Sequence, residues 1–165
     1  MKLGRDKLDR LKFFLAVSSG FLLTLSFPKA GISWLAWFAL VPLLVALRNL
    51  SLKNAFILGL CAGLAHYITL VYWLAYTMTT YGNLPFYVSV PVLLLFSAYL
   101  AIYPAIFSMA LTGLCPRPVF LVFMPPVVWV ALEYIRSFLF TGFPWELVGY
   151  TQFKVLNIIQ ISDIS

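Results

Sequence analysis

The residues of this chain that could carry chemistry gather between positions 129 and 152. Trp129, Glu133 and Arg136 are spaced four and three residues apart, so on a helix they would share one face. The run that contains them, 119–139, is otherwise apolar, and charged side chains inside a membrane are costly and mark candidate functional sites. An acid beside a base could equally form a structural ion pair that fixes helix packing, and the spacing alone does not separate these alternatives.

A break in the chain follows this pair. Gly142 and Pro144 are predicted to end the helix. Trp145 then lies just beyond the helix, where an indole would either anchor the chain at the membrane interface or offer a flat wall to a lipid. The long side chain of Arg136 could extend outward toward a phosphate. The candidate lipid-binding residues predicted from this stretch are Trp145, Glu133, Arg136, Phe143 and Tyr150.

The remaining reactive side chains do not form a second site in the sequence. His66 is the only histidine, and the two cysteines, Cys61 and Cys115, fall in a membrane helix and in an inner loop. A structural or catalytic metal site needs three or four such ligands in a recognisable spacing. No metal and no cofactor are therefore predicted, and His66 is interpreted as a hydrogen-bonded packing residue.

Two rival functions fit parts of the same pattern. A small transporter or channel subunit would use Glu133, Arg136 and His66 to line a pathway, although the paired repeats of many transporters are missing. An assembly module would use a face of small residues at four-residue spacing, which lets two helices approach closely. That face consists of Ala55, Gly59 and Gly63.

The elements that must position these residues are membrane helices. Hydrophobic residues make up 63% of the 165 residues and charged residues only 10%, with a mean hydropathy of +0.99, whereas a soluble domain carries about a quarter charged residues. The chain is therefore predicted to be an all-α integral membrane protein. A bundle of five transmembrane helices, followed by the start of a truncated sixth, is predicted from apolar runs at 13–27, 32–47, 55–76, 86–111 and 119–139.

The positive charges predict how this bundle lies in the membrane. The first two runs are shorter than the roughly 20 residues of a full crossing, so they could form one broken crossing or two short ones. Two crossings place eight of the eleven Lys and Arg residues on one side, which the bias of basic residues toward the cytoplasm favours. The predicted division is a basic cytoplasmic N-terminus at 1–12, the bundle at 13–139 and a periplasmic-side interfacial segment at 140–165. Because the net charge of +6 is concentrated on the N-terminal flank, nucleic acid is not a predicted partner.

Two stretches of the sequence resemble a known family. The run EYIRSFLFTGFPWELVGYTQ, followed by IIQISDIS, closely resembles a segment of bacterial apolipoprotein N-acyltransferases, and SFPKAGISWLAWFALVPLLVAL is similar to that family's first helical hairpin. The resemblance implies a multi-pass enzyme of the inner membrane. It would transfer an acyl chain from a phospholipid to the N-terminal cysteine of a diacylated lipoprotein, in the last step of lipoprotein maturation. It also implies that Trp145, the tryptophan of the FPW motif, is important for activity.

The same resemblance implies where the covalent chemistry takes place. In that family it passes through a thioester on a cysteine, helped by a glutamate and a lysine, in a nitrilase-like domain that faces the periplasm. The sequence stops at Ser165, about where the family's sixth helix begins. We therefore expect the catalytic set to lie outside this chain, which would form the lipid-facing part and be inactive alone. The expected partners are a phospholipid acyl donor, a diacylated lipoprotein and the membrane.

Overall fold

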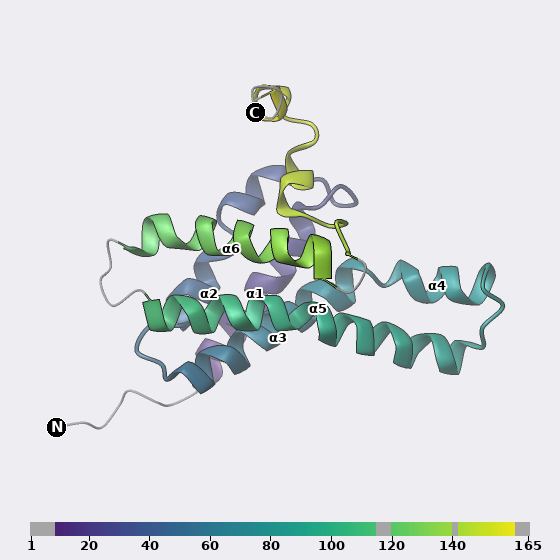
Figure 1. Ribbon diagram of the computed structural model, residues 1–165, viewed down its shortest axis with the longest axis horizontal. Helices are drawn as coiled ribbons and strands as arrows, with labels where there is room; N and C mark the ends of the chain where they lie inside the picture. The colour runs from purple at the N-terminus through teal and green to yellow at the C-terminus, as the bar shows by residue number, and fades with distance from the viewer. Residues whose placement is uncertain (1–8, 115–119, 140–141, 161–165) are drawn as a thin grey trace.

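The computed structural model describes residues 9–114, 120–139 and 142–160, and every regular element within them is helical (Figure 1). The prediction of an all-α chain is confirmed. The long helices are α1 (Arg10–Ser26), α3 (Leu52–Leu70), α5 (Phe86–Leu114) and α6 (Phe120–Phe138). The short ones are α2 (Val41–Ala46), α4 (Trp73–Thr80) and α7 (Leu156–Ile159), with two 3-10 turns, η1 (Ser33–Trp37) and η3 (Val148–Gln152). Cys115, the predicted turn at 116–118 and most of the predicted N-terminal segment 1–12 lie outside the described residues.

Helix α1 and the segment after it form a hairpin, with the turn at residues 27–31. The returning segment, η1 and α2, runs back along α1. The Ser19 hydroxyl donates to the Ala39 carbonyl at 2.6 Å, and the Lys12 ammonium donates to the Arg48 carbonyl at 3.0 Å. Neighbouring elements here point in opposite directions, as expected for short connections in a bundle.

Helices α3 and α5 pack at the centre of the molecule. An added Cβ on Gly59 of α3 would overlap the Pro104 carbonyl oxygen of α5, and one on Gly63 would lie 2.8 Å from the Ala101 Cα. The two backbones approach this closely only because both positions lack a side chain. Gly59 and Gly63 of the small-residue face therefore pack against α5 of the same chain.

The prediction of five membrane-spanning helices is not confirmed at that level of detail. Among the described residues, α5 is the one helix long and apolar enough by itself to cross a bilayer, and α3 with α4 makes a second if the pair, bent by 45°, is counted as one span. The run predicted over 32–47 is a shorter apolar helical segment, Ser33–Ala46. It is divided into the 3-10 turn η1 and the helix α2, and Pro42 at the start of α2 lacks the amide hydrogen that would continue a regular helix through this point. The run 55–76 is interrupted near Val71.

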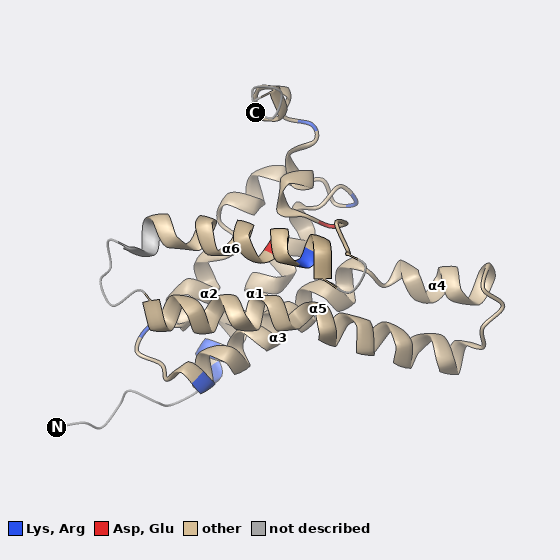
Figure 2. Ribbon diagram, viewed as in Figure 1, with Lys and Arg blue, Asp and Glu red and all other residues tan. Residues whose placement is uncertain are grey.

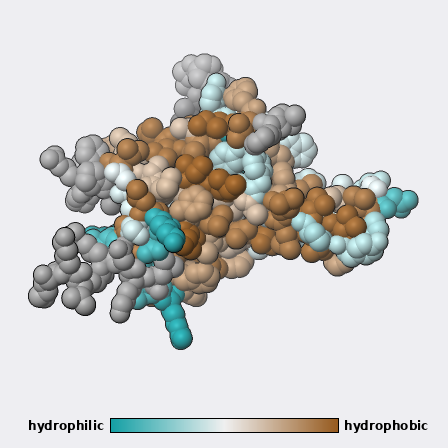
Figure 3. Space-filling view, turned by 60° about the horizontal axis from the view of Figure 1, so that its bottom comes forward, coloured by the Kyte–Doolittle hydropathy of each residue, from teal (hydrophilic) through white to brown (hydrophobic). Residues whose placement is uncertain are grey.

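The surface is apolar over large areas. Figure 2 shows few charged residues along the chain, and the face in Figure 3 is largely brown, the colour of hydrophobic residues. Helix α4 and the first half of α5 extend together away from the other helices (Figure 1). Their large side chains are among the most exposed, including Tyr87 at 77% and Leu95 at 74%. Apolar exposure on this scale is unusual for a soluble monomer and is expected where the neighbour is lipid.

Candidate lipid-binding site

Helix α6 carries the predicted acid and base, and it lies along α5. The Trp129 ring of α6 packs edge-on against Phe107 of α5, with centroids 5.1 Å apart. The predicted shared face exists. The Trp129 Nε1 donates to the Glu133 Oε1 at 2.9 Å, and the Arg136 Nη2 lies 4.0 Å from that same oxygen. The ion pair is therefore long, and both members make closer contacts elsewhere.

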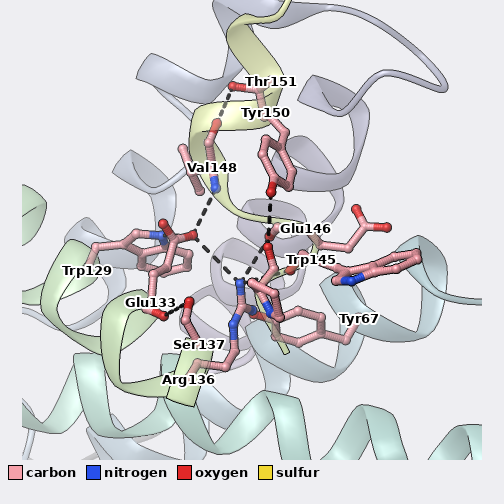
Figure 4. A network of polar contacts seen from close by, with 11 residues as sticks. Tyr67, Trp129, Glu133, Arg136, Ser137, Trp145, Glu146, Val148, Tyr150 and Thr151 are labelled. Carbon is pink, nitrogen blue, oxygen red and sulfur yellow. Dashed lines mark hydrogen bonds and ion pairs between the residues drawn. The ribbon is translucent and has the colours of Figure 1, made fainter. Parts of the chain in front are cut away.

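Arg136 is directed inward and is only 2% exposed. Its Nη1 donates to the Tyr67 hydroxyl of α3, and its Nη2 donates to the backbone carbonyls of Trp145 and Glu146 at 3.3 and 3.2 Å (Figure 4). The expectation that Arg136 extends outward to a phosphate is wrong, because its terminal donors are used inside the protein. The guanidinium instead fixes the backbone that carries Trp145.

Glu133 holds the same segment through the carboxylate oxygen that faces Arg136. Its Oε1 accepts a hydrogen bond from the Val148 amide at 2.9 Å, in addition to the one from Trp129 (Figure 4). The acid thus binds an N–H group while the base binds C=O groups of the same stretch. Together they fix residues 145–148 against α6 at three points.

Gly142 lets the chain leave α6 sharply. Its φ of +82° lies in the left-handed region that favours glycine, and an added Cβ would overlap the Ser137 carbonyl oxygen. The Phe143 amide then donates to the Arg136 carbonyl at 3.1 Å, which satisfies one of the carbonyls left unpaired at a helix end. The predicted break is confirmed, with α6 ending at Phe138.

A cavity of about 580 Å³ lies beside this segment. Three parts of the chain line it: residues 27–29 after α1, residues 70, 72 and 73 at the junction of α3 and α4, and residues 144–146 together with Tyr150 and Phe153. The Trp73 and Trp145 rings stack with centroids 6.4 Å apart and planes inclined by 23°. The walls are therefore largely aromatic and apolar, with few polar groups, which is the usual character of a small-molecule site.

The predicted site residues fall into two layers around this cavity. Trp145 and Tyr150 line it, and the Phe143 ring stacks on Trp145 with centroids 6.4 Å apart. Glu133 and Arg136 lie behind the 145–148 segment and do not line the cavity. The structure thus brings all five together: two line the cavity, one stacks on Trp145, and two support the segment from behind. Binding of lipid by any of them stays a prediction.

Glu146 lines the cavity although the sequence did not single it out as a site residue. Its backbone is held by Arg136, yet its carboxylate points away from that guanidinium, to the side of the Trp145 indole (Figure 4). It adopts a left-handed φ of +59°, which is uncommon for a residue with a side chain. Burial raises the pKa of the Glu146 carboxyl above its ordinary value, and the Arg136 charge offsets part of that rise.

Other contributors were missed because they come from distant parts of the chain. Tyr67 lies 69 residues before the arginine it binds, and nothing near it in the sequence predicts that contact. Tyr72 and Trp73 fit an aromatic belt at the membrane interface equally well. Lys29 sits in a turn that reaches the cavity only through the fold.

His66 lies apart from this site. Its Nδ1 is 2.9 Å from the Thr24 hydroxyl, which joins α1 to α3, and the residue is 2% exposed. The cavities beside His66 and beside Arg136 hold only about 10 Å³ each, which is room for about one water molecule. These residues line no continuous passage in the described part of the chain, so the transporter alternative is not favoured.

Comparison with known proteins gives a consistent result. Residues 19–165 match the family described as the apolipoprotein N-acyltransferase N-terminal domain. The chain is 48% identical over 160 residues to the apolipoprotein N-acyltransferase of Geobacter metallireducens. The aligned region covers 97% of this chain and 31% of that protein. Similar proteins of the same description occur in Wigglesworthia glossinidia brevipalpis (29% identity, 94% of this chain, 33% of that protein) and Methylococcus capsulatus (34%, 84% and 28%). The chain thus spans about a third of the length of the relatives it matches.

Proposed function

The chain belongs to the apolipoprotein N-acyltransferase family, and on that premise we propose that it forms the part of such an enzyme that holds the lipid substrate. The reaction is the transfer of an acyl chain from a phospholipid to the N-terminal cysteine of a diacylated lipoprotein. Support comes from the cavity that the stacked Trp73 and Trp145 rings help to line. Its aromatic walls suit an acyl chain or the glycerol end of a lipid, and the fixed backbone behind Trp145 keeps the indole in one place.

The wall must be rigid because the transfer of an acyl chain from the bilayer into the cavity has little hydrophobic driving force. Lipid tails are as apolar as the cavity, so moving an acyl chain from the bilayer into it gains almost no hydrophobic energy. Selection of the donor then depends on shape and on polar contacts. An indole held from behind by three hydrogen bonds, to the backbone of residues 145, 146 and 148, offers such a shape at low entropic cost.

The proposed membrane arrangement keeps the five passes expected from the sequence. Its helices would be α1, the η1–α2 segment, α3 with α4, α5 and α6. The hairpin of α1 with η1–α2 would make two passes in opposite directions, and its end at Lys12 and Arg48, which the structure joins by a hydrogen bond, would be the cytoplasmic one. The cavity would then lie at the periplasmic end of the bundle, in a bacterial inner membrane, and residues 140–165 would lead into a sixth helix.

The covalent step is assigned to residues outside these 165. Cys61, half-buried in α3, does not line the cavity, so it is not proposed as the nucleophile. The chain's own residues would bind and orient: Trp73, Trp145 and Tyr150 at the acyl donor, with Glu133 and Arg136 as positioning residues behind them. The diacylated lipoprotein would meet the donor at this face of the membrane.

A hybrid enzyme tests this role. Residues 1–165 would replace the matched N-terminal segment of the Geobacter metallireducens relative, and acylation of a diacylated lipopeptide would be followed by mass spectrometry. Trp145→Ala should lower the rate about three- to tenfold, since aromatic contacts contribute about 0.5–1.5 kcal/mol beyond burial. Trp37→Ala, which removes an indole that is 65% exposed in η1, is the matched control.

Two results would count against the proposal, and they differ in meaning. Equal rates for the Trp145 and Trp37 variants would remove the assigned role of the aromatic wall. An unsubstituted hybrid that is folded, inserted in the membrane and inactive would instead show that this chain cannot serve as the lipid-holding part of the enzyme.

A further inference from the structure

The turn between α1 and η1 places a positive charge at the edge of the cavity. Lys29 lies in this turn and lines the cavity together with Trp73 and Trp145. Its ammonium sits 4.0 Å from the centroid of the Tyr72 ring. A cation–π contact of this kind holds the side chain in place while leaving the ammonium's hydrogen-bond donors available.

A second ammonium lies close to the same turn. The Lys154 Nζ is 3.6 Å from the position that a Cβ on Gly31 would occupy, and it lies 5.3 Å from the ring centroid of Phe153, another lining residue. A second positive charge, from a distant part of the sequence, therefore lies near the turn that carries Lys29.

Neither charge is neutralised by the protein in the part of the chain that the structure describes. The ion pair found there joins Glu133 to Arg136, and neither Lys29 nor Lys154 has a carboxylate within that contact distance. Glu146 lines the same cavity but makes no such pair. The positive-inside bias does not explain these two lysines either, because they lie at the opposite end of the α1 hairpin from Lys12.

We propose that Lys29, with Lys154 near the same turn, binds the phosphate of a phospholipid whose glycerol and acyl portions lie against Trp73 and Trp145. This inference rests on the proposed function and adds the group that selects the donor. Lysine is a common phosphate ligand that acts as a point charge. The Glu146 carboxylate disfavours an anion beside it, so the phosphate is assigned to the Lys29 wall and not to the Glu146 wall.

The occupant is a lipid headgroup and not free phosphate, for two reasons. The cavity of about 580 Å³ is far larger than a single phosphate needs, and most of its lining is aromatic or aliphatic. Its stacked indoles offer nothing to a small hydrated anion, whereas they complement the apolar part of a phospholipid.

Equilibrium binding to the 165-residue chain in detergent tests the proposal without requiring turnover. Isothermal titration calorimetry would compare three probes: dihexanoylphosphatidylglycerol, dihexanoylglycerol, which lacks the phosphate, and inorganic phosphate. The variants are Lys29→Gln, which removes the charge, Lys29→Arg, which keeps it, and Lys53→Gln as a control. Lys53 is an exposed lysine at the start of α3, away from the cavity.

The wild-type chain should bind the phospholipid more tightly than the diacylglycerol. Lys29→Gln should weaken phospholipid binding about tenfold, the usual effect of losing one charge-assisted hydrogen bond, and leave diacylglycerol binding unchanged. Lys29→Arg should stay within about twofold of the wild type, as should Lys53→Gln.

Three outcomes would overturn the assignment: no phospholipid binding by the wild-type chain, equal phospholipid affinity for wild type and Lys29→Gln, or inorganic phosphate binding as tightly as the phospholipid with the same dependence on Lys29. The last would identify a free-phosphate site. Each can occur while the Trp145 variant still lowers acyl transfer in the hybrid, so failure here is distinguishable from failure of the proposed function.

Discussion

Replacing Arg136 with methionine should loosen the segment that carries Trp145 while filling much of the same buried space. The change removes the guanidinium's hydrogen bonds to the Tyr67 hydroxyl and to the carbonyls of Trp145 and Glu146. It also leaves Glu133 without its positive neighbour. Both effects act on the wall of the cavity and not on the cavity's own side chains.

The magnitude follows from these contacts. Hydrogen bonds between membrane helices average about 0.6 kcal/mol each, so three of them give a lower bound of about 2 kcal/mol. Hydrogen bonds to charged groups in soluble proteins contribute about 1.5–3 kcal/mol each, which would give a larger loss. We expect the free energy of unfolding to fall by about 2–4 kcal/mol.

Two measurements on the chain in detergent separate a local effect from a global one. Thermal unfolding reports overall stability, and hydrogen exchange of the Val148 amide reports whether residues 145–148 still rest on Glu133. Arg136→Met should lower the melting temperature and speed this exchange, and Tyr134→Phe, at an exposed position on α6, should do neither. A lower melting temperature with unchanged Val148 exchange would show that Arg136 stabilises helix packing alone and would refute its assigned role.

Two further predictions concern the same segment. Gly142→Ala should destabilise the chain by about 1–3 kcal/mol, because alanine resists the positive φ and its Cβ would overlap the preceding turn. Gly149→Ala, where an added Cβ meets nothing within 4 Å, is the control, and equal melting temperatures for the two variants would contradict the prediction. Since the pKa of Glu146 is raised in the folded chain, the folded state holds this proton more tightly than the unfolded state. Stability should therefore fall as pH rises from the ordinary glutamate pKa to the raised one. In melting temperatures measured across this pH range, the Glu146→Gln variant should show a smaller fall than the wild type. Parallel curves for the two proteins would refute this prediction.

The parts of the fold that the sequence predicts are those with a local cause. Gly142 and Pro144 break a helix by their own chemistry, and the Gly59 and Gly63 spacing marks a close helix contact wherever its partner lies. The interruption near Val71 could not be predicted, because no glycine or proline marks it in the sequence. Apolar runs also do not show where a helix is replaced by tighter turns, as happens between η1 and α2.

The candidate site divides in the same way. The shared face of Glu133 and Arg136 follows from helix periodicity, but their partners do not, since these are backbone groups of a segment that turns back on α6. The cavity depends on three separate parts of the chain meeting. In the sequence, Lys29 looks like an ordinary turn residue and Trp73 like an ordinary aromatic residue of the membrane interface. Only the fold brings them to the cavity that Trp145 also lines.

The contacts of the acid and base explain why a chain with so few charges keeps this pair. Between Gly142 and Leu147 the backbone is not helical, so its polar groups, where they are buried, need hydrogen-bond partners elsewhere in the protein. A lone carboxylate could accept from an N–H group but leave the carbonyls unpaired, and a lone guanidinium would do the reverse. Glu133 takes the Val148 amide and Arg136 takes the two carbonyls before it. Each residue thus binds the kind of backbone group that the other cannot, and the long separation between them follows from this division of contacts. The pair therefore stabilises an irregular stretch of backbone. This stretch places the Trp145 indole at the edge of the cavity, a position that it would not reach if α6 continued as a helix.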